Sequence, residues 1–373
     1  MRSRTVTQRD IAKLLGIHQT AVSFALRGEQ CVSEETRQRV QQAAKDLGYN
    51  SETHHAARLM QNSRYGIKVA NRTIAIINQL LDTDDPYNLD VMLGIAEVMK
   101  QAGYDILLCN IDPRNAEEFQ NSPNFMRGYI DGVLLHTPVE VPMVVPSVLL
   151  SLLPSGSRSV VCYPGEIASL SAVSVNEAQG AYQATRHLLE MGHRQILQFK
   201  PLGCEHLWRK RLGGIQQAFY EFGLDPAAAL HLLELSWGWI DPRNDFSQLP
   251  PLTPIYDEQP QPTTTLPDYL QAHQEVTALL AWNDPSAIHA WLSLQEAGYH
   301  IPEKISIVGF DDTHAMYDAR QKNVLTSVHQ PLFQVGEQAA QRLLAQITDE
   351  NAPIQCTNLP CELSVRQSTR RLS

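Results

Sequence analysis

Two polar side chains at the start of a predicted helix, Gln19 and Thr20, have the chemistry needed to read the edges of base pairs. A glutamine amide can form two hydrogen bonds with adenine, and the threonine methyl group can contact that of thymine. Both residues open the segment 19–26, in which Phe24 lies one turn further on and either faces the same groove or turns into the helical core. Other residues suit phosphate contacts, which position a protein without specifying sequence: Thr7, Ser23, Arg27 and Arg37.

The elements around these residues form a predicted three-helix module. Thr7 can cap a helix over 8–15, with Asp10 completing a capping-box-like pair, and Gly16 allows a sharp turn. Ser33 can cap a third helix that ends at Gly48. Residues at helical spacing are expected to form the inward-facing stripes: Ile11, Leu14 and Leu15, then Thr36, Val40, Ala43, Ala44 and Leu47. Two helices joined through a glycine turn and braced by a third follow the helix-turn-helix plan. His18, at the start of the second helix, should be a weak cap.

The distribution of charge supports a nucleic-acid partner for this module alone. The whole chain of 373 residues has a net charge of −10. Residues 1–72, however, contain twelve Lys/Arg and six Asp/Glu, whereas the rest contains 18 and 34. A basic module on an acidic body can approach phosphate without the whole protein coating the nucleic acid.

The N-terminal segment resembles the DNA-binding headpiece of the lactose-repressor (LacI/GalR) family of bacterial transcription regulators. The resemblance rests on Val6-Thr7-Gln8-Arg9-Asp10-Ile11-Ala12, Gly16-Ile17, Thr20-Ala21-Val22-Ser23, Val32-Ser33, Thr36-Arg37 and Leu47-Gly48-Tyr49. It implies a sequence-specific repressor that binds palindromic double-stranded DNA as a homodimer. The family most often has arginine, which reads guanine, at the position of Phe24. Phenylalanine cannot donate those hydrogen bonds, so we expect a changed operator base there.

Residues 51–72 correspond to the family's hinge, with departures from its pattern. The family places a short helix here whose leucine wedges into the minor groove. The Ala57-Arg58 pair falls about two residues late, and Ser51-Glu52 replaces the usual Pro-Asn. Arg58, Leu59 and Met60 are the candidate DNA contacts. The alternative is a flexible linker whose apolar residues pack against the following domain.

From Thr73 onward, short apolar strands alternate with amphipathic helices, which predicts parallel sheets covered by helices on both faces. This body resembles the family's α/β sensor, which has the two-lobed fold of type I periplasmic binding proteins. Matching pieces are Gly103-Tyr104, Asp131-Gly132-Val133, Gly180-Ala181-Tyr182, Gly192-His193-Arg194, Arg211-Leu212-Gly213-Gly214, Asn283-Asp284, the run 305–312 and Leu325-Thr326-Ser327-Val328. The proline-rich segment 237–268, with two tryptophans, is interpreted as an inserted loop beside the ligand cleft.

The expected domain organisation follows from these patterns. The headpiece comprises residues 1–50, the hinge 51–72, and the effector-binding and dimerisation domain 73–373. Within that domain, the N-lobe is expected to contain 73–163 and 329–355. The C-lobe is expected to contain 164–328 and 356–373. The chain shows no heptad tail, so a coiled-coil tetramer is not indicated.

The resemblance implies an effector cleft between the lobes, near the carboxyl ends of the strands. Arg211 and Asp311 match the family's hydroxyl-binding arginine and aspartate, although the alternative is an ion pair between lobes. Asn283 and Asp284 match its Asn-Asp pair. Tyr87, Trp208 and Trp282 could stack on a sugar ring, the alternative for each tryptophan being ordinary core. Tyr163-Pro164 replaces the family's Asp-Arg, which argues against a standard pentose or hexose.

Other classes of function have little support in the sequence. No nucleophile elbow, phosphate-binding glycine loop or clustered His/Cys ligand set is evident, so we expect no enzyme activity, cofactor or metal. Reduced, buried thiols are expected at the six cysteines: Cys31, Cys109, Cys162, Cys204, Cys356 and Cys361. No apolar run of membrane-spanning length and no signal peptide is present, which favours the cytoplasm. The remaining alternative is a solute-binding protein with the same sensor fold and no regulatory role.

Overall fold

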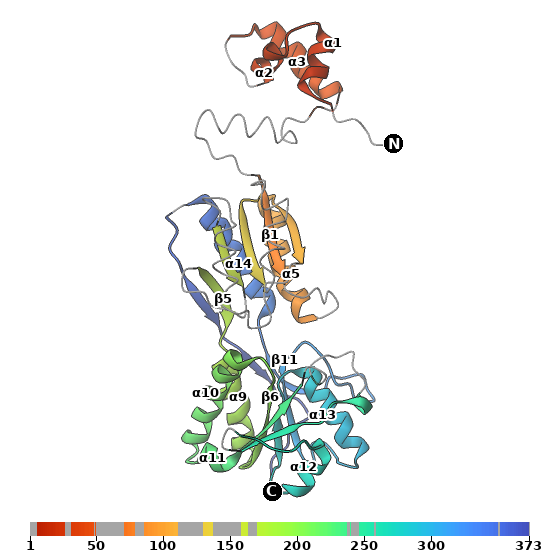
Figure 1. Cartoon of the computed structure of the whole chain (residues 1–373), viewed down its shortest axis with the longest axis vertical. Coiled ribbons are helices and arrows are strands. Elements are labelled where there is room, and N and C mark those ends of the chain that lie inside the picture. Colours follow the sequence, from red (N-terminus) through yellow and green to blue (C-terminus); the bar gives the residue numbers. More distant parts are fainter. Residues whose placement is uncertain are drawn as a thin grey trace. The chain divides into compact units, whose positions relative to one another are not determined.

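The computed structural model describes residues 6–26, 31–47, 49, 71–78, 86–110, 130–136, 158–162, 170–236, 239, 246–256, 259–349 and 351–372. The chain divides into two compact units, residues 1–70 and 71–373 (Figure 1). Each unit is built around its own buried apolar core.

The first unit contains the three expected helices: α1 (Gln8–Leu15), α2 (Gln19–Leu26) and α3 (Glu34–Asp46). The capping box between Thr7 and Asp10 is confirmed, since each side chain accepts a hydrogen bond from the other residue's backbone N–H. Gly16 ends α1 in the left-handed conformation, with φ of 66°. Ser33 caps α3 as expected. His18 also acts at the start of α2, because its Nδ1 accepts from the backbone N–H of Thr20 at 3.3 Å.

The core of the headpiece differs from the expected pattern at one position. Ile11, Val22, Ala25 and Val40 are fully buried and hold the three helices together. Leu14, however, is 60% exposed, so the predicted stripe Ile11, Leu14, Leu15 is wrong at its second member. Ala12 takes its place in the core, because Ile11 and Ala12 share the buried side of this short helix.

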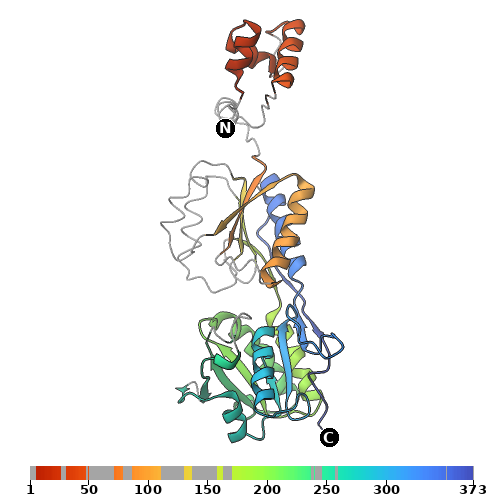
Figure 2. The ribbon, with the colours of Figure 1, turned by 90° about the vertical axis from the view of Figure 1, so that its right-hand side faces the viewer.

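The second unit contains two sheets, of which the first has the strand order β13-β5-β4-β3-β1-β2 and is parallel in every pair described. Its strands are β1 (Thr73–Asn78), β2 (Asp105–Asn110), β3 (Gly132–His136), β4 (Arg158–Cys162), β5 (Ser171–Val175) and β13 (Cys356–Leu359). The helices α5 (Pro86–Ala102) and α14 (Leu332–Thr348) lie side by side on one face of this sheet (Figure 2). Their backbones approach closely where Gly94 and Gly336 remove side chains from the contact.

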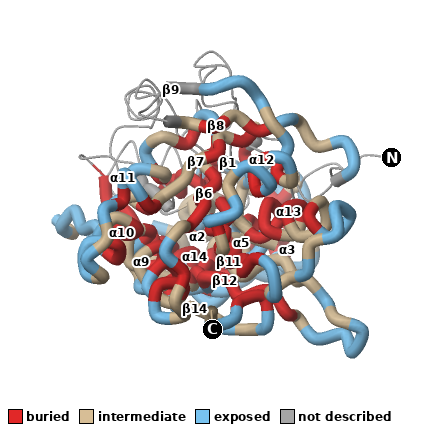
Figure 3. The backbone as a smooth tube through the Cα atoms, turned by 90° about the horizontal axis from the view of Figure 1, so that it is seen from below, coloured by how far each residue is buried: buried red, intermediate tan, exposed pale blue. Residues whose placement is uncertain are grey.

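The second sheet has the order β14-β12-β11-β10-β6-β7-β8-β9. Its strands are β6 (Ile196–Pro201), β7 (Leu230–Leu235), β8 (Thr253–Tyr256), β9 (Gln259–Pro260), β10 (Ala278–Leu280), β11 (Ser306–Asp311), β12 (Thr326–His329) and β14 (Glu362–Ser364). The helices α9 (Glu177–Glu190) and α10 (Glu205–Glu221) cover one face, while α12 (Leu266–Ala272) and α13 (Asp284–Glu296) cover the other (Figure 1). The short helix α11 (Pro226–Ala229) leads into β7. The central strands of this sheet are buried along nearly their whole length (Figure 3).

The chain passes between the two sheets three times within the described residues, and this corrects the expected lobe boundaries. The passages follow β5, β12 and β13, so β5 and β13 both belong to the first sheet. The expected boundaries at 163/164 and 355/356 therefore fall one strand too early. Only their pairing partners assign β5 and β13 to a lobe, and the sequence of a strand does not reveal its partners.

The proline-rich segment 237–268 is more ordered than the expected loop, in the part that the structure describes. It contains the 3-10 turn η2 (Phe246–Gln248) and the strands β8 and β9, which extend the second sheet in antiparallel fashion beyond β7. Trp239 is buried, contacts Phe199 edge-on at 5.5 Å and donates to the carbonyl of Pro250 at 2.7 Å. The segment therefore adds to the edge of the sheet and to its core.

Two expectations drawn from composition are tested by the same structure. Cys109, Cys204 and Cys361 are buried free thiols, but Cys31 and Cys356 are exposed, which corrects the expectation for those two. The side chain of Cys162 lies outside the description. Among the described helices, none combines the length and the apolar character needed to cross a bilayer.

Neighbouring glycines on α10 provide a test of the helix packing in the second lobe. A Cβ at Gly214 would lie 1.9 Å from the carbonyl oxygen of Ala178 on α9, whereas a Cβ at Gly213 would meet nothing within 4 Å. We expect Gly214→Ala to lower the free energy of unfolding by about 1–3 kcal/mol through overpacking. The matched control Gly213→Ala should raise it by up to about 1 kcal/mol, as alanine does in an exposed helix. Urea unfolding of both variants, followed by circular dichroism, measures the difference, and equal effects would contradict this packing.

Candidate functional site

The headpiece presents part of the predicted DNA-binding set on its surface. Thr7, Gln19 and Thr20 are exposed, and Ser23 is partly exposed. Phe24 has intermediate exposure, whereas its neighbours Val22 and Ala25 are fully buried. Arg37 forms an ion pair with Glu34 at 2.7 Å. The remaining predicted contacts lie outside the described residues: Arg27, Arg58, Leu59 and Met60.

The second unit contains a buried charged centre around Arg211, one turn after Trp208 on α10. Its Nε donates to Glu177 at 2.6 Å, and the two side chains are only 6% and 1% exposed. Its Nη1 donates to the carbonyl of Trp282, and its guanidinium lies over the rings of Trp282 and Phe310, 4.0 and 3.5 Å from their centroids. A buried guanidinium is tolerated only when its charge and its donors are matched in this way.

Asp311 is the second acid near Arg211 and is held in an unusual backbone conformation at the end of β11. Its Oδ1 lies 3.9 Å from Nη2 of Arg211, beyond hydrogen-bonding distance. The same oxygen accepts from the side chain of Gln330 at 2.7 Å. Asp311 and Asp312 have φ of 95° and 56°, in the left-handed region that non-glycine residues rarely adopt. Such strain is common at ligand sites, where the surroundings hold it in place.

These contacts attach the charged centre to the passages between the lobes. Glu177 follows the first passage, and Gln330 lies within the second. In the third passage, the backbone N–H of Cys361 donates to Oε1 of Gln179 at 2.9 Å. The backbone N–H of Asn176 donates to the carbonyl of Leu359 at 2.8 Å. Burial first, and then the charge of Glu177, raises the pKa of Cys361 to about 12, so this thiol stays protonated. A displacement of Arg211 would therefore change its bond to Glu177, and a displacement of Asp311 would change its bond to Gln330. Both partners lie at passages between the lobes.

The structure corrects the alternative in which Arg211 and Asp311 form an ion pair between the lobes. Both residues belong to the second lobe, so their attraction does not bridge the lobes. The closer partner is Glu177, which the sequence did not single out because an acid in the first turn of a helix is common and usually exposed. Phe310 and Gln330 were also missed, since an apolar strand residue and a lone glutamine are unremarkable in sequence.

Asn283 and Asp284 have structural partners at the start of α13. Asn283 caps the helix by accepting from the backbone N–H of Ser286 at 3.0 Å. Asp284 is fully buried and accepts hydrogen bonds from Ser327 at 2.5 Å and from the backbone N–H groups of Thr313 and His314 at 2.8 and 3.1 Å. The carboxylate therefore fixes the loop that follows Asp311. Burial raises its pKa to about 7, against the opposing effect of these hydrogen bonds.

The three aromatic candidates have different environments. Trp282 is buried beneath Arg211, which favours its alternative as core. Trp208 is partly exposed, with the ammonium of Lys200 5.1 Å from its ring centroid. Tyr87, on the first turn of α5, is partly exposed and packs against the core of the first lobe. A small cavity of about 20 Å³ lies beside Arg211 and Gln198, between α9, α10 and the second sheet.

Three family descriptions match the chain in succession. Residues 7–52 match bacterial regulatory proteins of the lacI family. Residues 70–239 match periplasmic binding proteins and the sugar binding domain of the LacI family, and residues 185–369 match a periplasmic binding protein-like domain. Together these matches cover the headpiece and both lobes.

Curated relatives and solved structures agree with these matches. The HTH-type transcriptional repressor PurR of Haemophilus influenzae (strain PittEE) is 27% identical, over 98% of this chain and 99% of that protein. PurR of Photobacterium profundum is 24% identical over the same shares. The lac repressor dimer bound to operator and the anti-inducer ONPF has a TM-score of 0.70 at 20% identity, covering 98% of this chain and 100% of that one. A cellobiose complex of the regulator CelR has a TM-score of 0.60 at 23% identity, covering 97% and 99%.

The buried carboxyl of Asp284 predicts a measurable dependence of stability on pH. Because its pKa is raised by folding, the folded state favours the proton, and this group's contribution to stability falls as pH rises from about 4 to about 7. The uncharged variant Asp284→Asn does not have this pH-dependent loss of stability. We expect the stability of the variant relative to the native protein to increase by on the order of 4 kcal/mol across that range and to level off above it. Urea unfolding at several pH values tests this, and a difference that is constant or falls with pH would refute it.

Proposed function

The chain belongs to the LacI family of bacterial regulatory proteins, and we propose that it is a cytoplasmic transcriptional repressor controlled by a small carbohydrate. It would bind a palindromic operator as a homodimer, because two-fold symmetric half-sites require a two-fold symmetric protein. The observation that carries this proposal is the headpiece, in which α1 and α2 join through Gly16 and leave Gln19 and Thr20 exposed.

The headpiece supports a division between residues that position it and residues that read sequence. Thr7, Ser23, Arg27 and Arg37 are proposed to contact phosphates, and Gln19 and Thr20 to contact bases. Phe24, on the same helix, is partly exposed. It would meet an apolar edge such as a thymine methyl group, since it has no donor for guanine. Arg58, Leu59 and Met60 remain proposed contacts of the hinge.

The effector is proposed to bind at the face of the second lobe formed by Arg211, Asp311 and Trp208. The 3.9 Å gap between Arg211 and Asp311 is too long for a hydrogen bond, yet a ligand hydroxyl could bridge it by accepting from the arginine and donating to the aspartate. Trp208 and Tyr87 would supply apolar surface for the C–H face of a sugar. Asn283, Asp284 and Trp282 would act by holding the walls of the site, because their contacts are internal.

This placement supports a route from ligand to DNA. A ligand that draws Asp311 toward itself changes the bond to Gln330, and one that moves Arg211 changes the pair with Glu177. Both partners lie at passages between the lobes, so the ligand would favour one lobe arrangement over another. Coupling requires only that the ligand bind one arrangement more tightly, and the same energy then appears in operator affinity.

Gln19→Ala tests the proposed base contact. Operator sequences are first selected from random duplex DNA with the full chain, and binding is then measured by fluorescence anisotropy at several salt concentrations. We expect Gln19→Ala to weaken specific binding by about 1–3 kcal/mol and to leave the salt dependence unchanged, because a base contact releases no counterions. Gln38→Ala, an exposed glutamine on α3, is the matched control. Failure to select any palindromic sequence would refute the proposed function.

Asp311→Asn tests the effector site in a thermal-shift screen against sugars and sugar phosphates. A ligand that binds only the folded protein raises its melting temperature. We expect a sugar that shifts the native protein to bind Asp311→Asn at least about tenfold more weakly, because a charged acceptor is lost. Glu296→Gln, an exposed carboxylate on α13, should respond like the native protein. An unchanged shift in Asp311→Asn would contradict this placement of the ligand.

A further inference from the structure

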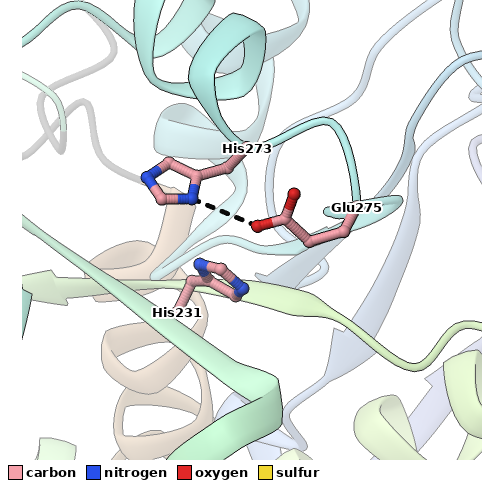
Figure 4. Close-up of side chains that lie close together, drawn as sticks. All are labelled: His231, His273 and Glu275. Carbon is pink, nitrogen blue, oxygen red and sulfur yellow. Dashed lines mark hydrogen bonds and ion pairs between the residues drawn. The ribbon is translucent and has the colours of Figure 1, made fainter.

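Two histidines and a glutamate meet where the start of β7 lies beside the end of α12 (Figure 4). His231 is the second residue of β7, His273 ends α12, and Glu275 lies two residues further on. One potential ligand atom from each side chain lies within 4.8 Å of the other two. Sequence inspection expected no clustered ligands, because His231 is far from the other two in sequence.

We propose that His231, His273 and Glu275 form a binding site for a divalent transition-metal ion of the zinc class. Two imidazole nitrogens and one carboxylate oxygen are a donor set that Zn²⁺ accepts, with a fourth position left for water. Calcium and magnesium prefer oxygen ligands and fit this set poorly. The inference does not rest on the proposed regulatory function.

The geometry requires only small side-chain movements for coordination. Metal–ligand distances near 2 Å need the three atoms to approach more closely than they do here. Nδ1 of His273 already lies 3.2 Å from Glu275, and that glutamate side chain is 51% exposed and therefore free to rotate. The rings of His231 and His273 lie 5.4 Å apart between centroids.

The surrounding residues resemble the outer shell of a metal site. One ring nitrogen of His231 lies 2.9 Å from Oε1 of Gln195, and the other lies 3.0 Å from the hydroxyl of Tyr269. Binding would replace one of these hydrogen bonds, and the bond that remains would orient the ring. The ring of Tyr269 also stacks on His273, with centroids 4.3 Å apart. Because Tyr269 is buried, it restricts the position of both imidazoles.

The position of the site in the chain indicates what the ion would do. His231 precedes the proline-rich segment 237–268, and His273 and Glu275 follow it. An ion held by all three residues would join the start of β7 to the end of α12 and so link the two ends of this segment. A cross-link across a long loop stabilises the folded state, and an ion that binds only that state raises the melting temperature.

Zinc binding by the untagged full chain tests this inference. After treatment with a chelator, the protein is titrated with ZnCl₂ by calorimetry in a buffer that does not bind metal. We expect one site that is weakened at least about tenfold by Glu275→Gln and by His273→Ala. We also expect Zn²⁺ to raise the melting temperature of the native protein and not that of the variants. Co²⁺ provides a second readout, since its visible absorption reports a nitrogen-containing, four-coordinate site.

Matched variants keep the experiment decisive. Glu303→Gln and His300→Ala change an exposed carboxylate and an exposed imidazole elsewhere in the same lobe and should bind Zn²⁺ like the native protein. Glu275→Gln preserves the size of an exposed side chain, so its folding is expected to be unaffected. Zinc binding that is absent in the native chain, or equal in Glu275→Gln, His273→Ala and the controls, would overturn the proposal. Operator binding is not part of this readout, so the two proposals fail independently.

Discussion

The buried pair between Arg211 and Glu177 is the constraint on which the second lobe depends. A guanidinium removed from water must be matched by charge and by acceptors, and here a carboxylate, a backbone carbonyl and two aromatic faces match it. To bring Glu177 to Arg211, α9 must lie against α10, and the close approach at Gly214 allows it. The pair thus determines helix packing and the position of the first passage between lobes together.

In the proposed function, ligand recognition and lobe movement would use the same few side chains. Asp311 accepts from Gln330 in one passage and lies near Arg211, which holds Glu177 at another. The carboxylate of Asp284 accepts hydrogen bonds from the loop after Asp311 and so limits the conformations of that loop. These hydrogen bonds leave Asp311 and the loop after it little freedom to move alone. A displacement caused by a ligand at the proposed site would be transmitted to the segments that join the lobes.

Local features of the structure could be predicted from sequence, whereas features set by distant partners could not. The caps at Thr7, Gly16 and Ser33 follow from hydrogen bonds within one turn of helix, and all three are confirmed. The alternation of apolar strands and helices was evident, but the residues of β5 and β13 were assigned to the wrong lobe because pairing partners have no local signature. Glu177 was missed for the same reason, since only its burial against Arg211 distinguishes it. The segment 237–268 stood out by its composition, yet its strands β8 and β9 depend on pairing with the edge of β7.

The path of the last strands has a consequence for synthesis of the protein. β13 completes the first sheet beside β5, and β14 adds to the second sheet beside β12, although both strands lie within the last twenty residues of the chain. α14, which covers the first sheet, also comes after most of the second lobe has been made. Neither lobe can therefore be completed before most of the other has been synthesised. Folding of one lobe to completion before the next is made, which separate domains can follow, is therefore not open to these two lobes.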